Sequence, residues 1–362
     1  MSARLSRLRS LLADRGLDGV LITDPANRFY LSGYTAEDHA PGDSAGVLLI
    51  GQDVATLLTS ANNLDWAASE ATDFQVRRWT RPWTATVVED IREYGWKRVG
   101  FEDAAILFST HRDVASGLNG AAELVPIGDG VSRLRSVKED EELRAIERAL
   151  AIGDQVFAQV ASWLRPGLTE RAVAREVECL VREAGADGLS FPPSVAAGPH
   201  AARPHHRPTE RPLREGEPVI IDLGARVGGY AGDLTRTVWL GAPDERLRAV
   251  YNVVWSAQAA AIADLRAGIA ASQADWAARR VVESAGHGTH FVHGLGHGLG
   301  IRVHEAPSLS ATAIDALQPG EVVTVEPGIY VPGWGGVRIE DVVVIEEMGC
   351  RVLTRAPKLS PV

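Results

Sequence analysis

Residues 219–237 read VIIDLGARVGGYAGDLTRT, and residues 322–344 read VVTVEPGIYVPGWGGVRIEDVVV. Each stretch is an apolar run, a glycine-rich turn and a returning run, a pattern that predicts a β-hairpin. Acidic residues interrupt all four runs: Asp222 and Asp233 in the first stretch, Glu326 and Glu340 in the second. Carboxylates are costly to bury unless cations or metal ions accompany them. The two stretches therefore predict a fold and a site together.

The two hairpins belong to a longer internal repeat. Residues 165–185 and 266–286 share an arginine, a glycine and a terminal Ala-Gly at a constant offset of 101 positions. A long amphipathic helical pattern precedes each stretch, the second over residues 244–265, and a hairpin follows each. We therefore predict that the C-terminal part is a duplicated helix–helix–hairpin unit whose two halves pack their sheets into one curved surface.

The N-terminal part predicts a separate α/β domain with its own sheet. Strands are expected at residues 18–24, 46–50, 55–60, 74–79, 97–103 and 122–128, and a helix at residues 63–71. A chain of 362 residues also favours two domains. Ser136 and Glu139 form an S-x-x-E capping box, predicted to start a helix that runs through Leu164. The expected domains are residues 1–130 and 131–362, and the first contains no catalytic constellation.

Composition narrows the classes of partner. The net charge of −10 argues against nucleic acid or an anionic membrane as a partner. The sequence contains no run of 18 apolar residues, so no membrane span is predicted, and the N-terminus is not expected to be a secretory segment. Cys179 and Cys350 are too few for a disulfide framework and are expected to be core residues, which suits a cytoplasmic protein.

The four carboxylates point to a shared metal centre. The alternative is four separate salt bridges, for which Arg226, Arg236, Arg302 and Arg338 are the nearby cations. One acid per run, at equivalent places in both halves of a repeat, favours the shared centre. Four carboxylates balance two divalent ions, which bridging carboxylates can hold ~3.5–4 Å apart. An oxygen-rich set without cysteine suits Mn²⁺, with Co²⁺ or Zn²⁺ as alternative occupants.

One histidine is expected to supply a nitrogen ligand. The stretch HGTHFVHGLGHGLGIRVHE, residues 287–305, holds five of the ten histidines. His293 and His297 have the spacing of a helical zinc pair. The glycines at 294, 296, 298 and 300 argue against a helix, since each costs about 1 kcal/mol relative to alanine. The segment is therefore predicted to be extended, closely packed backbone.

The motifs VIIDLGA, YAGDLTRT, HGLGHGLGIRVHE, VEPGIY and GVRIED, in this order, closely resemble those of the pita-bread-fold metallopeptidases. The sequence is most similar to the proline-specific branch, the Xaa-Pro aminopeptidases and the Xaa-Pro dipeptidases (prolidases). NRFYLSGY and VGFED resemble the creatinase/prolidase N-terminal domain, so the resemblance covers essentially the whole chain. It implies a mixed α/β (α+β) fold: an N-terminal α/β creatinase-like domain and a C-terminal pita-bread (creatinase/aminopeptidase) domain with a pseudo-twofold repeat.

The resemblance implies two metal ions per chain and assigns their ligands. Asp222 would be a terminal ligand of one ion, and Asp233 and Glu340 would bridge both. His297 and Glu326 would complete the second ion.

The resemblance also implies residues that act on the substrate. His205, His293 and His304 match the substrate-handling histidines of the family, and His304 would bind the developing oxyanion. Glu326 would carry a proton to the leaving nitrogen, and Arg338 would support the bridging carboxylates. Tyr230 stands before the Asp233 motif with no assigned role. The other nearby histidines are expected to be loop or surface residues, although two of them are close enough to His205 to line the pocket: His200, His206, His287 and His290.

The expected activity is that of a Xaa-Pro aminopeptidase of the aminopeptidase P type. Such an enzyme removes the first residue from peptides with proline in second position, by means of a hydroxide that bridges the two metal ions. In the related dipeptidases a basic residue follows the HE-x-P stretch, whereas HEAPSLS here places Ser308 in that region. The alternative is a Xaa-Pro dipeptidase in which Arg203 or Arg207 holds the carboxylate of the dipeptide.

Other relatives of the fold fit the sequence less well. Creatinase has no metal centre, methionine aminopeptidases generally lack this N-terminal domain, and non-catalytic pita-bread binding modules generally lose metal ligands. The family resemblance further implies a homodimer or a tetramer.

Overall fold

The computed structural model describes residues 3–40 and 42–358. The chain divides into two compact units, Met1–Arg135 and Ser136–Val362. The division falls after Arg135, whereas the sequence analysis placed it after residue 130. Helix α6 (Gly130–Ser136) explains this position. Arg135 Nη1 donates to Asn27 Oδ1 (2.6 Å), and the Tyr30 hydroxyl donates to the carbonyl of Leu134 (3.0 Å), so the helix is bonded to the first unit.

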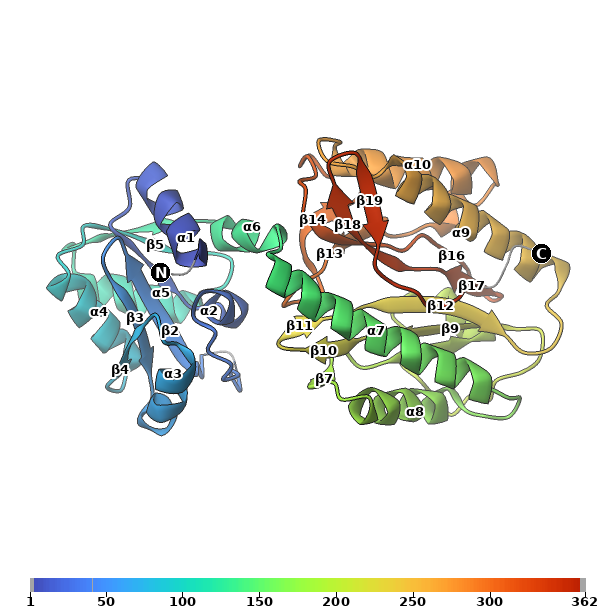
Figure 1. Cartoon of the computed structure of the whole chain (residues 1–362), viewed down its shortest axis with the longest axis horizontal. Coiled ribbons are helices and arrows are strands. Elements are labelled where there is room, and N and C mark those ends of the chain that lie inside the picture. Colours follow the sequence, from blue (N-terminus) through green and yellow to red (C-terminus); the bar gives the residue numbers. More distant parts are fainter. Residues whose placement is uncertain (1–2, 41, 359–362) are drawn as a thin grey trace. The chain divides into compact units, whose positions relative to one another are not determined.

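The first unit is built on a six-stranded mixed sheet with the order β4-β3-β2-β1-β5-β6 (Figure 1). Strand β1 pairs antiparallel with β2 and parallel with β5. The strands are β1 (Gly19–Ile22), β2 (Gly46–Gly51), β3 (Ala55–Thr59), β4 (Gln75–Arg78), β5 (Arg98–Phe101) and β6 (Glu123–Pro126). The helices are α1 (Ala3–Asp14), α2 (Pro25–Ser32), α3 (Leu64–Glu70), α4 (Trp83–Glu93), α5 (Phe108–Leu118) and α6, with the 3-10 turn η1 (Ala61–Asn63). All six strands lie where the sequence predicts them, and the spacing of Leu5, Leu8 and Leu12 predicts α1. Helices α2, α4, α5 and α6 were not predicted.

The first half of the second unit contains two helices and two small sheets. The helices are α7 (Asp140–Trp163) and α8 (Glu170–Glu183). Their apolar faces pack on the sheet β12-β9-β8. The remaining elements are β7 (Gly188–Leu189), β8 (Ser194–Ala197), η2 (Gly198–Ala202), β9 (Pro218–Leu223), β10 (Ala225–Val227), β11 (Tyr230–Ala231) and β12 (Leu234–Trp239).

The second half repeats this order. Helices α9 (Glu245–Asp264) and α10 (Ala271–Ser284) pack on the sheet β14-β13-β15-β18-β19. In Figure 1 the strands of this unit lie between the α9/α10 pair and the α7/α8 pair. The remaining elements are η3 (Gly288–His290), β13 (Gly296–Gly298), β14 (Glu305–Leu309), β15 (Val322–Val325), β16 (Gly328–Val331), β17 (Gly335–Arg338), β18 (Asp341–Glu346) and β19 (Gly349–Val352).

The predicted fold class, including the internal repeat, is confirmed. Helices α8 and α10 begin and end at positions that differ by 101 residues, the offset seen in the sequence. The predicted start of the helix before α8 was wrong. The capping box consists of Glu139 and Glu142, so α7 begins at Asp140. Ser136 cannot be its cap because the next residue, Val137, forms a β-bridge with Glu321.

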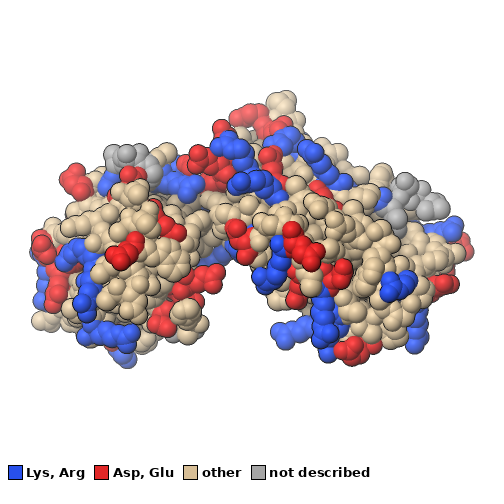
Figure 2. Space-filling view, turned by 60° about the horizontal axis from the view of Figure 1, so that its bottom comes forward, with Lys and Arg blue, Asp and Glu red and all other residues tan. Residues whose placement is uncertain are grey.

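Neither cysteine is in a disulfide. Cys350 is half-buried, but Cys179 is exposed. The expectation of two core cysteines was therefore wrong for Cys179, because helix α8 buries the opposite face, which carries Val177 and Val181. No described helix combines the length and the apolarity that a membrane crossing requires. Basic and acidic side chains are interspersed on the face shown in Figure 2.

The glycine-rich segment around His297 is extended backbone, as the sequence predicts. Strand β13 lies between β14 and β15 and pairs with both. A Cβ atom at Gly296 would lie 2.1 Å from the carbonyl oxygen of Thr324, and one at Gly298 would lie 2.1 Å from that of Ala306. Side chains are excluded at both positions, because the neighbouring strands approach the backbone on either side of His297.

We predict that Gly298→Ala destabilises the second unit by about 3 kcal/mol, because the added methyl group forces β13 and β14 apart. Thermal unfolding checks this. Gly153→Ala is the matched control. A Cβ at this position would meet only Leu223 Cδ1, at 3.5 Å, and the substitution replaces a glycine inside helix α7 with a better helix former. The control should unfold at the same temperature or higher. Equal stability of the two variants would contradict the close approach of β13 and β14.

Candidate metal centre

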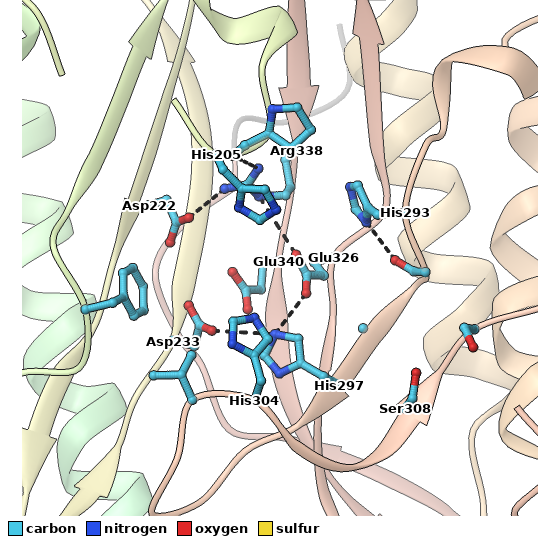
Figure 3. A pocket seen from close by; sticks show the side chains of 16 residues that line it. His205, Asp222, Asp233, His293, His297, His304, Ser308, Glu326, Arg338 and Glu340 are labelled. Atoms are coloured by element: carbon cyan, nitrogen blue, oxygen red, sulfur yellow. Dashed lines mark hydrogen bonds and ion pairs between the residues drawn. The ribbon is translucent and has the colours of Figure 1, made fainter. Parts of the chain in front are cut away.

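Four carboxylates reach one pocket from equivalent places in the two halves of the second unit (Figure 3). Asp222 lies on β9, and Asp233 lies between β11 and β12. Glu326 follows β15, and Glu340 lies between β17 and β18. The pocket has a volume of about 530 Å³. It is lined by Phe191, Pro204, His205, Asp222, Asp233, His293, Gly294, Gly296, His297, Val303, His304, Ser308, Ser310, Glu326, Arg338 and Glu340.

The structure brings the five residues predicted to bind metal together. Carboxylate oxygens of Asp222, Asp233 and Glu340 all lie within 4.8 Å of one another. His297 Nε2 is 3.2 Å from Glu326 Oε1 and 3.9 Å from Asp233 Oδ2. The backbone N–H of Glu326 donates to the carbonyl of Leu295 (2.8 Å). Glu326 is thereby tied to the segment that carries His297.

Burial and neighbouring charges set the ionisation of these side chains in the metal-free protein. Burial raises the pKa of Glu340 to about 8, and the charges of Glu326 and Asp222 add to the effect. The pKa of Asp233 is raised well above its usual value by burial and then by the charge of Glu340. Burial opposes the ionisation of Glu326 as well, but the hydrogen bond and charge of His297 lower its pKa to about 2. Glu326 is therefore ionised, whereas Asp233 and Glu340 resist ionisation.

The donor set fits divalent metal ions. Asp222 Oδ1 and Glu340 Oε1 are buried and have no hydrogen-bond partner within residues 3–40 and 42–358. Arg338 and His297 are the cationic neighbours of the four carboxylates, too few to balance all four if every carboxylate were ionised. Two divalent cations would neutralise the carboxylates and bind the unpaired oxygens. Oxygen donors with one imidazole and no thiolate suit hard or borderline ions.

Arg338 is bonded to one wall of the pocket rather than to its open space. Its Nη2 pairs with Asp222 Oδ2 (2.6 Å), and its Nε donates to the hydroxyl of Thr235 (3.2 Å). Its Nη1 donates to the hydroxyl of Tyr330 and to the carbonyl of Pro204, both at 3.1 Å. Among the described residues that line the pocket, Arg338 is the one arginine or lysine. It fixes the position of Asp222, so no arginine or lysine of the described lining is free to bind a substrate.

Tyr330, which the sequence analysis did not identify, orients His293. His293 Nδ1 lies 2.7 Å from the carbonyl of Gly294, so this nitrogen carries the hydrogen. Its Nε2 is then an acceptor for the hydroxyl of Tyr330 at 2.9 Å. Burial lowers the pKa of His293, which agrees with a neutral ring. His293 is in the pocket, but both of its ring nitrogens are bound to the protein.

His205, His304 and Ser308 line the pocket as well. The rings of His304 and His297 lie 4.1 Å apart, and burial together with the charge of His297 lowers the pKa of His304. Arg203 and Arg207 are exposed and do not line the pocket. Tyr230 is also outside it, because its hydroxyl donates to Glu142 on α7 (2.8 Å). His287 and His290 face each other, with 3.4 Å between their Nδ1 atoms, and are not part of the lining.

His200 and His206 bind a buried glutamate instead of lining the pocket. Glu170 is the first residue of α8 and is fully buried. Its Oε1 lies 2.9 Å from His200 Nδ1, and its Oε2 lies 2.9 Å from His206 Nε2. The same carboxylate accepts the backbone N–H groups of Ala197 and Thr209 and the Thr209 hydroxyl.

This second cluster of possible ligands is already saturated with hydrogen-bond donors. A carboxylate has about four lone-pair sites, and here protein donors occupy them. Glu170 is therefore an anchor for the segment 197–209, which carries Pro204 and His205 to the pocket. The sequence does not indicate that Glu170 is buried, because an acidic residue at the start of a helix is ordinarily explained by the helix dipole.

The fold and the pocket define a metallopeptidase of the pita-bread class, as the motifs of the sequence predicted. The chain belongs to metallopeptidase family M24, whose model matches residues 144–347. The model of the Creatinase/Prolidase N-terminal domain matches residues 4–137.

Relatives of known sequence or structure cover nearly the whole chain. The chain is 38% identical to the peptidase YqhT of Bacillus subtilis over 355 residues, 98% of each protein. It is 32% identical to the Xaa-Pro dipeptidase of Pyrococcus furiosus over 360 residues, 99% of each. Among solved structures, the Xaa-Pro dipeptidase of Bacillus anthracis matches with a TM-score of 0.93 and 34% identity, covering 98% of each chain. The X-Pro aminopeptidase of Thermotoga maritima matches with a TM-score of 0.88 and 31% identity, covering 98% of this chain and 99% of that one.

We predict that the metal-free protein becomes less stable as the pH rises from 5 to 8. The pKa of Glu340 is about 8 in the folded protein and about 4.5 in the unfolded chain, so the folded state holds more protons across this window. The contribution of protonated Glu340 to the free energy of unfolding is complete below about pH 4.5 and is lost as the pH approaches 8. Asp222 and Asp233, whose pKa values are also raised, act in the same direction.

The test compares metal-free Glu340→Gln with the metal-free wild type. The variant should be more stable at pH 8 by on the order of 2 kcal/mol and should differ little at pH 5. Glu346→Gln, at the exposed end of strand β18, which begins directly after Glu340, is the control and should match the wild type at both pH values. A Glu340→Gln variant without extra stability at pH 8 would contradict the strained carboxylate cluster.

A second prediction concerns the anchor of segment 197–209. Glu170→Ala should speed the hydrogen exchange of the Ala197 and Thr209 amides at least tenfold, because both lose their buried acceptor. Glu178→Ala, an exposed glutamate on the same helix, should leave the exchange unchanged. Unchanged protection in Glu170→Ala would show that Glu170 does not organise this segment.

Proposed function

We propose that the protein is a proline-specific exopeptidase of the Xaa-Pro dipeptidase (prolidase) type. The observation that carries the proposal is the pocket with four carboxylates and His297, on a chain that matches the Xaa-Pro dipeptidases of Bacillus anthracis and Pyrococcus furiosus over nearly its whole length. Ser308 stands where the dipeptidases carry a basic residue, which on sequence alone favours the aminopeptidase. The dipeptidase matches now outweigh that single position.

Five residues would hold two divalent cations in the pocket, with Mn²⁺ as the occupant we expect. Asp222 would bind one ion, Asp233 and Glu340 would bridge both, and His297 and Glu326 would complete the other. When bound, the ions polarise the substrate carbonyl and make water a strong nucleophile at neutral pH.

The chemistry of the substrate explains why such a centre suits proline. The amide nitrogen of proline carries no hydrogen, so the enzyme needs the carbonyl and a nucleophile but no amide N–H. Glu326 is ionised and faces the pocket, so it can accept the proton of the attacking water and pass it to the leaving nitrogen. A neutral His304 can donate an N–H to the developing oxyanion, and His205, which also lines the pocket, can act as a second donor.

The remaining pocket residues position these groups. Arg338 holds Asp222 through its ion pair, and Tyr330 fixes the ring of His293. His293 therefore presents the edge and face of a fixed ring to the substrate, rather than a free ring nitrogen. Phe191 and Val303 add apolar surface to the pocket lining.

One observation favours the Xaa-Pro aminopeptidase as a second candidate. A dipeptidase binds the free carboxylate of its substrate, yet Arg338, the one arginine or lysine among the described lining residues, is already bonded to Asp222, Tyr330, Thr235 and Pro204. Arg203 and Arg207 are exposed and outside the lining. In the dipeptidase the carboxylate must then be held by the pocket histidines, or by an arginine that moves.

The two candidates are separated by measuring kcat/KM of the Mn²⁺-loaded protein on Ala-Pro and on Ala-Pro-Ala. The dipeptidase proposal predicts that kcat/KM is at least tenfold higher for Ala-Pro, because the proline carboxylate contributes binding energy. A higher value for Ala-Pro-Ala would establish the aminopeptidase instead. If the protein cleaved neither Ala-Pro nor Ala-Pro-Ala, that result would contradict the proposed specificity for proline. Ala-Ala serves as the control substrate and should be cleaved poorly in either case.

A further inference from the structure

Gln258 is a buried polar residue on the apolar face of helix α9. Its side chain is 1% exposed, and it follows Leu247 and Val254 along the face that packs on the sheet of the second half. A side-chain amide at such a position is costly unless it is hydrogen-bonded. Gln258 is bonded, because its Nε2 donates to the carbonyls of Val325 and Ile339, each at 3.0 Å.

The two carbonyls that Gln258 binds precede the two glutamates of the metal centre. Val325 is followed by Glu326, and Ile339 is followed by Glu340. The ladder between β15 and β18 ends at the pair Val325–Asp341. The Gln258 amide therefore binds both chain segments at the point where they leave the sheet and enter the pocket.

Each glutamate is otherwise fixed to a different part of the unit. The N–H of Glu326 donates to the carbonyl of Leu295 (2.8 Å), whereas the N–H of Glu340 donates to the carbonyl of Thr235 on β12 (3.1 Å). Both side chains nevertheless line the same pocket. A single amide that binds the preceding carbonyl of both glutamates opposes their separation.

We propose that Gln258 is a positioning residue that sets the spacing between Glu326 and Glu340 so that both carboxylates reach the same pair of cations. The inference rests on the proposed metal centre and adds a residue outside the pocket that controls its affinity. A role in folding alone would require only that the two carbonyls have a donor. A positioning role requires in addition that metal binding weakens when the donor is lost in a folded protein.

The experiment uses Gln258→Met, which keeps the length of the side chain and removes the donor. Mn²⁺ binding to the folded, metal-free protein is followed by electron paramagnetic resonance at 10 °C, which reports free Mn²⁺ and the coupling between two bound ions. We expect binding of the second ion to weaken about 10- to 100-fold, the usual effect of losing a residue that supports metal ligands. The signal of the coupled pair should weaken in parallel.

Val254→Ala is the matched control. Val254 lies one turn earlier on the same buried face, and its truncation lowers the stability of the α9 packing without touching either carbonyl. This variant should bind both ions with wild-type affinity although it unfolds at a lower temperature. If Gln258→Met does not fold, Gln258→Asn replaces it, since asparagine keeps the amide but is too short to reach both carbonyls.

The outcomes separate the inference from the proposed function. A folded Gln258 variant with wild-type affinity for both ions and an unchanged coupled signal would overturn the positioning role and leave the metal centre intact. A Val254→Ala control that loses the second ion to the same extent would also overturn it, because general loosening of α9 would then be sufficient. A wild-type protein that binds no Mn²⁺ would contradict the metal centre, and the inference would fall with it.

Discussion

Mutual repulsion among Asp222, Asp233, Glu326 and Glu340 is the constraint on which the second unit depends. The folded chain holds them in one pocket with Arg338 and His297 as the cationic neighbours, so burial and repulsion raise the pKa of Glu340 to about 8. The metal-free protein thus stores an unfavourable arrangement that cations relieve. Metal ions that bind such a cluster gain affinity and stabilise the fold at the same time.

The duplicated architecture shows how the chain holds this arrangement. Each half contributes one hairpin with two acidic residues, so no single segment has to carry all four charges. The two hairpins are joined across the centre where Thr237 bonds both the N–H and the carbonyl of Arg338. Helix α9 supports the second hairpin through Gln258, and Glu170 at the start of α8 anchors the segment that carries His205. Helices on the outside of the unit therefore determine the geometry of the pocket inside.

Much of the fold and of the metal centre could be predicted from the sequence, because acidic residues in apolar strands and a repeat at constant offset are strong signals. The five proposed metal ligands and the lining residues His205, His293 and His304 lie in one pocket. The sequence could not predict the roles of Tyr330 and Glu170 or the exposure of Cys179, because each depends on which distant segment packs nearby. Gln258 left a weak signal, a polar residue at the spacing of an apolar helix face. The choice between dipeptidase and aminopeptidase depends on how a free carboxylate is held, and neither Ser308 nor the exposed Arg203 and Arg207 decides it.

The proposed function depends on the metal centre. The most direct test is X-ray diffraction from crystals of the protein grown with Mn²⁺, with data collected on both sides of the manganese absorption edge. We predict two anomalous peaks per chain, roughly 3.5–4 Å apart. Asp233 and Glu340 should contact both peaks. Asp222 should contact only one of them, and His297 and Glu326 should contact only the other. No peak at these side chains, or a peak at Glu170, His200 and His206 instead, would contradict it.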